Sequence, residues 1–281
     1  MASKVWPKVL GGCAVGCALV VFVIVAAGIG GWRLVKGTID GMRAAAETQQ
    51  ELEARFGAPR DWVPPLDGTI TQDRVEVFLD ARERLSAPRQ ELDRLLAALD
   101  APEGDRTLPG AIRALEAGAS VGPAVGDYLA ARDGVLLEVG MGLGEWTWID
   151  VLAYHAWRGE PIRPPEEPRS GDGRVQVHVG GDLSAEGGVR QARGDVYAMM
   201  RNLRDALEAA GGADSAWRDE VELEMARLRD DPSRLPWQDG LPDRVAASFE
   251  PYGDRFEATW SPRTAVFDLV RVGPHGIRVD N

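Results

Sequence analysis

The first long apolar stretch of the chain runs from residue 9 to residue 32 without a charged side chain. Lys8 and Arg33 border it, and Trp6 and Trp32 stand near its ends, where indole rings favour the headgroup level of a bilayer. A helix of this length spans about 36 Å, against about 30 Å for the hydrocarbon core of a membrane. Residues 9–32 therefore predict a single transmembrane helix that binds the membrane. A cleaved signal peptide is the alternative, but its apolar core is shorter and ends at a small-residue cleavage site.

Small residues inside this segment leave further interpretations open. Gly12 and Gly16 form a G-x-x-x-G pattern, which lets two helices approach closely and would allow self-association. Small residues that lipid simply tolerates are the alternative. Cys13 stands where a lipobox would place a lipidated cysteine, although a lipoprotein signal needs its apolar run before the cysteine. The short N-terminal tail with two lysines favours a signal anchor in the cell (inner) membrane, with the larger domain on the periplasmic side.

Helical periodicity continues beyond the membrane segment. Residues 33–57 carry a loose apolar stripe opposite a run of glutamates and glutamines, and they predict a membrane-proximal helical stalk. Apolar positions then recur at helical spacing in residues 71–100, as one kinked helix or two short ones. The same spacing predicts helices at residues 109–119, 123–157, 189–210 and 214–230.

Two segments show strand-like patterns instead. Residues 174–179 alternate strictly between polar and apolar side chains, and residues 266–272 with 277–279 resemble a hairpin around Gly273 and Pro274. The predicted fold class is therefore mainly α, with an N-terminal single transmembrane helix and a multi-helix soluble domain that includes a small β element.

The predicted domain organisation follows from these patterns. It comprises an N-terminal tail (1–8), the transmembrane helix (9–32), the stalk (33–57), a first helical group (58–159), a Pro/Gly-rich linker with a short strand (160–190) and a second helical group with the C-terminal hairpin (191–281).

Charge and cysteine usage narrow the function classes. The chain has a formal net charge of −12; residues 1–43 carry +4, which leaves −16 on the remainder. So acidic a body repels nucleic acid and anionic headgroups, and nucleic acid is therefore not expected as a partner. Both cysteines lie in the membrane segment, which excludes a cysteine zinc cluster elsewhere. Beyond residue 36 the chain contains arginine but no lysine, which indicates a GC-rich, bacterial genome.

The stretch from Glu145 to His155 is the best candidate for chemistry, because it places two carboxylates, a tyrosine and a histidine in an apolar helix. Glu145, Asp150, Tyr154 and His155 could serve as acids or bases, since burial shifts the pKa of such groups. Asp150 and Tyr154 lie one turn apart, whereas the five-residue step from Asp150 to His155 places these two on different sides of an α-helix. The alternative is structural: these groups cap or cross-link packed helices.

No established catalytic or metal-binding motif accompanies these residues. The sequence contains no Glu-x-x-His pair of di-iron bundles, no His-x-x-x-His zinc pair, no nucleophile elbow and no Walker loop. No metal and no cofactor is therefore predicted.

Two function classes remain. The leading prediction is a membrane-anchored helical interaction or structural module of the bacterial envelope, which binds a partner through an exposed groove lined by Trp146, Trp148 and Trp157. The rival is a membrane-tethered envelope enzyme with the four candidate acid–base residues around a cleft. Carboxylates that converge in a pocket would favour the enzyme, and the same side chains paired inside a sealed core would favour the module.

Overall fold

A computed structural model describes residues 41–99, 108–162, 185–211 and 214–272. This part of the chain is mainly helical, which confirms the mainly α part of the predicted fold class, and it contains no strand. The predicted transmembrane helix at residues 9–32, with Gly12, Cys13 and Gly16, lies outside the described residues. Among the helices that are described, none is long and apolar enough to cross a membrane.

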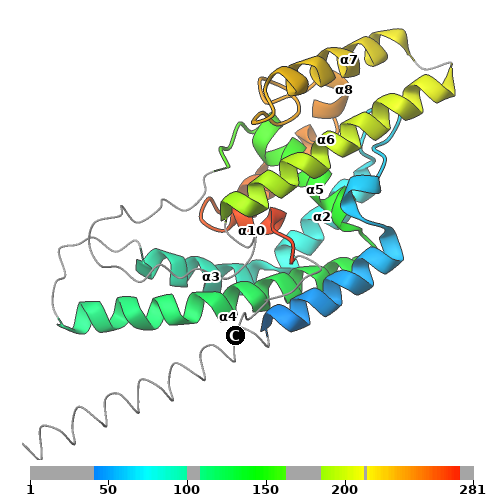
Figure 1. Ribbon diagram of the computed structural model, residues 1–281. Coiled ribbons are helices and arrows are strands. Elements are labelled where there is room, and N and C mark those ends of the chain that lie inside the picture. Colours follow the sequence, from blue (N-terminus) through cyan, green and yellow to red (C-terminus); the bar gives the residue numbers. More distant parts are fainter. Residues whose placement is uncertain (1–40, 100–107, 163–184, 212–213, 273–281) are drawn as a thin grey trace, which may run out of the picture.

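Helices α3 and α4 lie side by side and form the lower layer in Figure 1. α2 (Gln72–Arg84) and α3 (Ser86–Leu99) are separated at Leu85, so the segment predicted at 71–100 consists of two helices. α4 (Leu108–Val139) is longer than the sequence pattern indicates, because it continues through Pro123.

Residues 41–56, which belong to the predicted stalk, form a helix that runs along α4 in the same layer (Figure 1). One face of this helix is buried, at Met42, Ala45, Gln49 and Leu52. The Gln49 side chain accepts a hydrogen bond from the Val272 N–H at 2.8 Å and donates one to the Val272 carbonyl at 3.1 Å. The described part of the stalk is therefore packed into the domain.

A glycine-rich break separates α4 from α5 (Leu143–Asp150). Gly140 has a φ of 69°, a left-handed conformation that commonly follows the last residue of a helix. A Cβ on Gly144 would meet the Cβ of Trp62 at 2.5 Å, so only glycine fits where α5 approaches the chain after η1 (Pro59–Asp61).

A second layer is formed by α6 (Ala185–Ala210) and α7 (Ser215–Asp230), seen above the first in Figure 1. η1 packs on α6, and α10 contacts both α6 and α4. Trp217 of α7 stacks on Trp237 with ring centroids 5.8 Å apart. The remaining elements are the short helices α8 (Asp243–Ala246), η3 (Glu250–Tyr252), α9 (Gly253–Ala258) and α10 (Ala265–Leu269).

The predicted C-terminal hairpin is wrong in its first strand, because residues 265–269 form helix α10. The β-branched side chains here favour a strand, but every residue from Ala265 to Val270 is buried, Asp268 included, so the segment has no alternating exposed face. The second strand at 277–279 and the predicted strand at 174–179 lie outside the described residues.

The described residues of both predicted helical groups share one hydrophobic core. Phe78 and Trp146 from the first group and Met200 and Phe256 from the second belong to the same cluster of buried side chains. Phe78 packs against Trp146 with ring centroids 4.7 Å apart and against Phe256 at 6.1 Å. This core fixes the positions of the elements that carry the candidate site.

Candidate functional site

The segment predicted to carry chemistry begins in α5, which holds Glu145 and Asp150, and continues directly into a π-helix, η2 (Val151–Trp157), which holds Tyr154 and His155. A π-helix bonds each N–H to the carbonyl five residues earlier, so side chains five apart come onto the same side. The His155 Nε2 atom lies 3.9 Å from the Asp150 Oδ2 atom. The prediction that these two residues lie on different sides assumed α-helical geometry and is wrong.

Asp150 is completely buried and pairs with Arg82 of α2, which is buried as well. Arg82 Nη1 donates to Asp150 Oδ1 at 2.6 Å, whereas Oδ2 has no hydrogen-bond partner. Burial raises the pKa of Asp150 to about 7, although Arg82 acts in the opposite direction. This carboxyl group therefore changes its charge near neutral pH.

His155 is neutral at the pH at which Asp150 titrates. Its Nδ1 atom lies 2.6 Å from the Glu160 carbonyl oxygen, so Nδ1 carries the proton and donates it to this bond. Burial lowers the pKa of His155 to about 4. The Nε2 atom that faces Asp150 is therefore unprotonated at neutral pH.

Asp268 of α10 is a second buried carboxylate, and three donors converge on it. Arg82 Nη2 and Arg89 Nη2 each donate at 3.2 Å, and the Tyr128 hydroxyl donates to Oδ1. Burial alone would raise the pKa of Asp268, but the two arginines lower it below its ordinary value. We define the central charge cluster as Arg82, Arg89, Tyr128, Asp150, His155 and Asp268. It joins α2, α3, α4, α5, η2 and α10.

Arg132 of α4 extends these polar contacts to the end of α10. Its Nη1 atom donates to the carbonyls of Phe267, Asp268 and Val270 at distances of 3.0, 3.1 and 2.8 Å. Its Nε atom donates to Asp133 at 2.8 Å. The last carbonyls of a helix have no partner within the helix, so Arg132 acts as the C-terminal cap of α10.

The other two predicted acid–base residues are also paired. Glu145 accepts hydrogen bonds from Arg74 of α2, with the Nε and Oε1 atoms 2.6 Å apart. The Tyr154 hydroxyl lies 2.8 Å from Thr259 Oγ1, and the Tyr154 ring lies 4.4 Å from the Arg82 guanidinium carbon. Tyr154 therefore borders the central charge cluster, whereas Glu145 belongs to a separate ion pair.

The predicted tryptophan groove is not formed by the residues assigned to it. Trp146 and Trp148 are 0% and 3% exposed, and Trp157 is half-buried. Trp146 Nε1 donates to the Asp268 carbonyl at 3.1 Å. Trp146 and Trp148 belong to the core and Trp157 packs against it, so these indole rings do not line an exposed groove.

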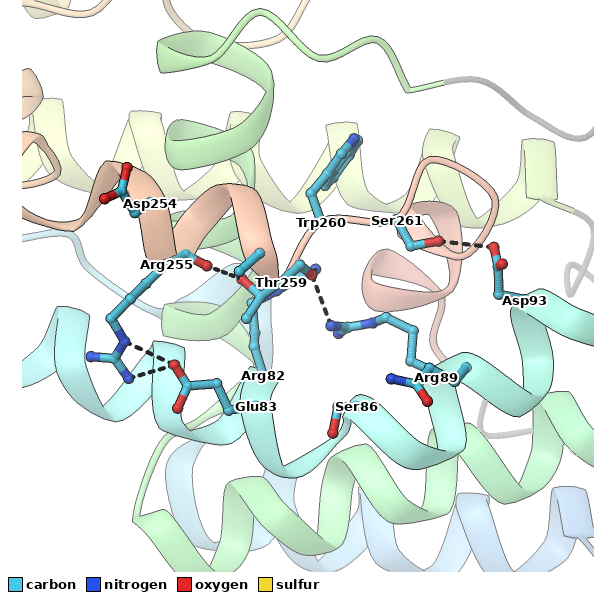
Figure 2. A pocket seen from close by; sticks show the side chains of 12 residues that line it. Arg82, Glu83, Ser86, Arg89, Asp93, Asp254, Arg255, Thr259, Trp260 and Ser261 are labelled. Carbon is cyan, nitrogen blue, oxygen red and sulfur yellow. Dashed lines mark hydrogen bonds and ion pairs between the residues drawn. The ribbon is translucent and has the colours of Figure 1, made fainter.

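A pocket of about 530 Å³ opens beside the cluster, between the α2–α3 corner and residues 254–261 (Figure 2). Arg82 and Arg89 lie deepest in it, since both are almost completely buried. None of the four candidate acid–base residues lines this pocket. Its charged lining is balanced, with three arginines and three carboxylates: Arg82, Arg89, Arg255, Glu83, Asp93 and Asp254.

The polar groups of this pocket engage one another (Figure 2). Arg255 Nε donates to Glu83 at 2.8 Å, and the Ser261 hydroxyl donates to Asp93 at 3.0 Å. No histidine lines the pocket, so neither of its serines has the histidine partner of a catalytic triad there. Across the part of the chain that the structure describes, no three His, Cys, Asp or Glu side chains are grouped to hold a metal ion. The pocket contacts fasten residues 254–261 to the α2–α3 corner.

The partners of the candidate residues are what sequence reasoning missed. Arg82 occupies an apolar position of the 71–100 stripe, which is a signal for a buried and paired arginine. Its partner Asp268 is 186 positions away, in a segment whose pattern indicates a strand. No local pattern connects the two.

No protein-family model, curated protein or solved structure matches the chain. Its class and function therefore rest on the fold and on the contacts described above.

Proposed function

We propose that the protein is a single-pass, membrane-anchored helical interaction module of the bacterial envelope, without a catalytic centre. One observation carries this proposal: the four candidate acid–base residues form structural pairs within the helical body, and none of them lines the pocket beside the central charge cluster. A general acid or base must reach a substrate, and these side chains instead reach Arg74, Arg82, Thr259 and the backbone of Glu160.

The tether rests on the sequence of residues 9–32, which is apolar and long enough to cross a bilayer. The helix at residues 41–56 follows closely and is fixed in the domain through Gln49 and Leu52. An anchor at residues 9–32 would thus hold the acidic body beside the membrane, on the periplasmic side in this proposal, while its charge keeps it away from anionic lipid.

Affinity purification of the tagged full-length chain in mild detergent tests this proposal. We expect one partner polypeptide at fixed stoichiometry, and we expect the Glu145→Gln variant to retain it, because no chemistry depends on this carboxylate. Absence of a stoichiometric partner would contradict the proposal. If a correctly folded Glu145→Gln variant keeps the partner but does not replace the wild-type protein in cells, the result would favour the membrane-tethered enzyme instead.

A further inference from the structure

A groove of about 850 Å³ lies between α6, the C-terminal end of α7 and residues 232–236. Val189, Leu228 and Pro236 give it an apolar, buried floor. Tyr197 stands at its edge with 36% of its surface exposed, one of the few large side chains with apolar surface that are exposed among the described residues. The groove therefore offers apolar contact area together with an accessible aromatic ring.

The charge of this groove differs from that of the pocket beside the central charge cluster. Four arginines line it and no carboxylate does: Arg190, Arg193, Arg229 and Arg234. The charge of Arg234 is balanced by ion pairs with Glu224, at 3.2 Å, and Asp239, at 2.8 Å. Arg193 and Arg229 form no ion pair within 4 Å with the residues that the structure describes, although the charge of Arg193 helps to lower the pKa of the exposed Asp231 carboxyl group. Arg193 Nε is buried without a hydrogen-bond partner. A chain of net charge −12 thus presents a positive groove here.

Gly194 lies in the groove, within α6. A Cβ at this position would meet no atom of the protein within 4 Å, so the packing of the chain itself does not require glycine. Glycine inside a helix costs about 1 kcal/mol relative to alanine. Its missing side chain leaves the helix backbone open beside Arg193, where another chain can approach closely.

We propose that this groove binds an extended, acidic segment of a partner protein. An apolar side chain of that segment lies on the floor, and its carboxylates reach Arg193 and Arg229. The stretch of α6 from Val189 to Tyr197 is about 12 Å long, which an extended chain spans with about four residues. A peptide is favoured over an anionic bilayer because the body of the chain, at −16, repels such a surface.

This inference rests on the proposed function and names the surface through which the module binds its partner. Fluorescence anisotropy of a labelled peptide, Glu-Glu-Pro-Leu-Glu-Glu, tests it on the full-length chain in a neutral detergent. We expect saturable binding that weakens as salt rises, and weakens about tenfold when glutamine replaces glutamate in the peptide. Arg193→Gln and Arg229→Gln should each weaken binding about two- to fivefold, the effect of one exposed ion pair.

Gly194→Leu supplies a steric test. Its side chain would fill the groove, so we expect binding to fall by about tenfold or more. Its melting temperature should be no lower than that of the wild type, since leucine favours a helix over glycine. Gly134→Leu in α4 is the matched control, because a Cβ there also meets nothing within 4 Å and Gly134 does not line the groove. This control should bind the peptide as the wild type does.

Unchanged binding by Gly194→Leu, equal binding of the glutamine peptide, or displacement of the peptide by phosphatidylglycerol vesicles would overturn the assignment. Self-association that Gly194→Leu abolishes would also overturn it, since the occupant would then be a second copy. If Gly194→Leu still recovers the stoichiometric partner, the groove assignment fails while the interaction module stands. If the peptide binds as expected but no partner is recovered, the groove stands and the module fails.

Discussion

Asp150 and His155 face each other across 3.9 Å inside the protein, among Arg82, Arg89 and Asp268, and burial shifts their pKa values in opposite directions. Asp150, with a pKa raised from 3.8 to about 7, keeps a proton that the unfolded chain releases, so its contribution to stability falls as pH rises between these values. His155, with a pKa lowered from 6.5 to about 4, lacks a proton that the unfolded chain binds, so its contribution falls as pH drops. Between about pH 4 and 6.5 the two effects oppose each other.

Asp150→Asn removes the contribution of Asp150 to the pH dependence of stability and leaves that of His155. We expect the free energy of unfolding of this variant, minus that of the wild type, to rise by up to about 1.4 kcal/mol per pH unit between pH 4 and 7. His155→Gln should reverse the sign of this slope between pH 4 and 6.5. Urea unfolding at stepped pH measures both differences, and differences that do not vary with pH would show that neither buried group has a shifted pKa.

Among the elements, α10 depends most on contacts from distant parts of the chain. Arg132 donates to the carbonyls of Phe267 and Asp268 and to that of Val270, the residue that follows α10, and the central charge cluster holds Asp268 in place. The same residues help to explain why this segment is a helix although its sequence favours a strand, because buried donors satisfy both its backbone carbonyls and its carboxylate.

Arg132→Met should destabilise the protein by about 3–5 kcal/mol, because it leaves Asp133 as an unpaired buried charge and the α10 carbonyls without a donor. Denaturant unfolding measures this loss. Arg84→Met is the matched control, since the Arg84–Glu138 pair is exposed and should contribute less than about 1 kcal/mol. Equal losses in the two variants would contradict the buried role of Arg132.

Gln49 tests whether the helix at residues 41–56 is an integral part of the domain. Gln49→Ala removes both partners of the buried Val272 backbone, so we expect a loss of about 1–3 kcal/mol. Gln50→Ala, on the exposed face of the same helix, should change stability by less than about 0.5 kcal/mol. Hydrogen exchange of the Val272 amide reports the same contact, and unaltered protection in Gln49→Ala would rule it out.

Sequence periodicity predicts the helices whose apolar positions recur regularly. It does not predict the segments whose conformation depends on contacts with distant parts of the chain. The apolar stripe around Phe78 and the one around Met200 each coincide with a helix. The π-helix is not predicted because the residues from Asp150 to His155 are equally compatible with an α-helix. The shift from i→i+4 to i→i+5 hydrogen bonds has no signature in the amino-acid composition. Asp150, Tyr154 and His155 are buried, as their apolar surroundings in the sequence indicate, but their partners, such as Asp268, come from remote positions that no local pattern reveals.

At the scale of the whole molecule, charge is distributed unevenly. The acidic body carries a positive groove on α6 and α7, while the buried charges pair within the core. Because one hydrophobic core joins the described helices, a partner in the groove and an anchor before residue 41 would act on the same folded unit. This arrangement suits a tethered binding module, in which the anchor sets the location and the groove selects the partner.

Membrane tethering is tested most directly by alkaline carbonate extraction of membranes that contain the full-length chain, followed by N-terminal sequencing. We expect the wild type to remain in the membrane pellet with its front end intact. A double variant, Val20→Arg with Ile24→Arg, should move into the wash, because each arginine at the centre of a span costs about 2.5–3.5 kcal/mol. Recovery of the wild type in the aqueous wash, shortened near its N-terminus, would contradict a membrane-tethered module.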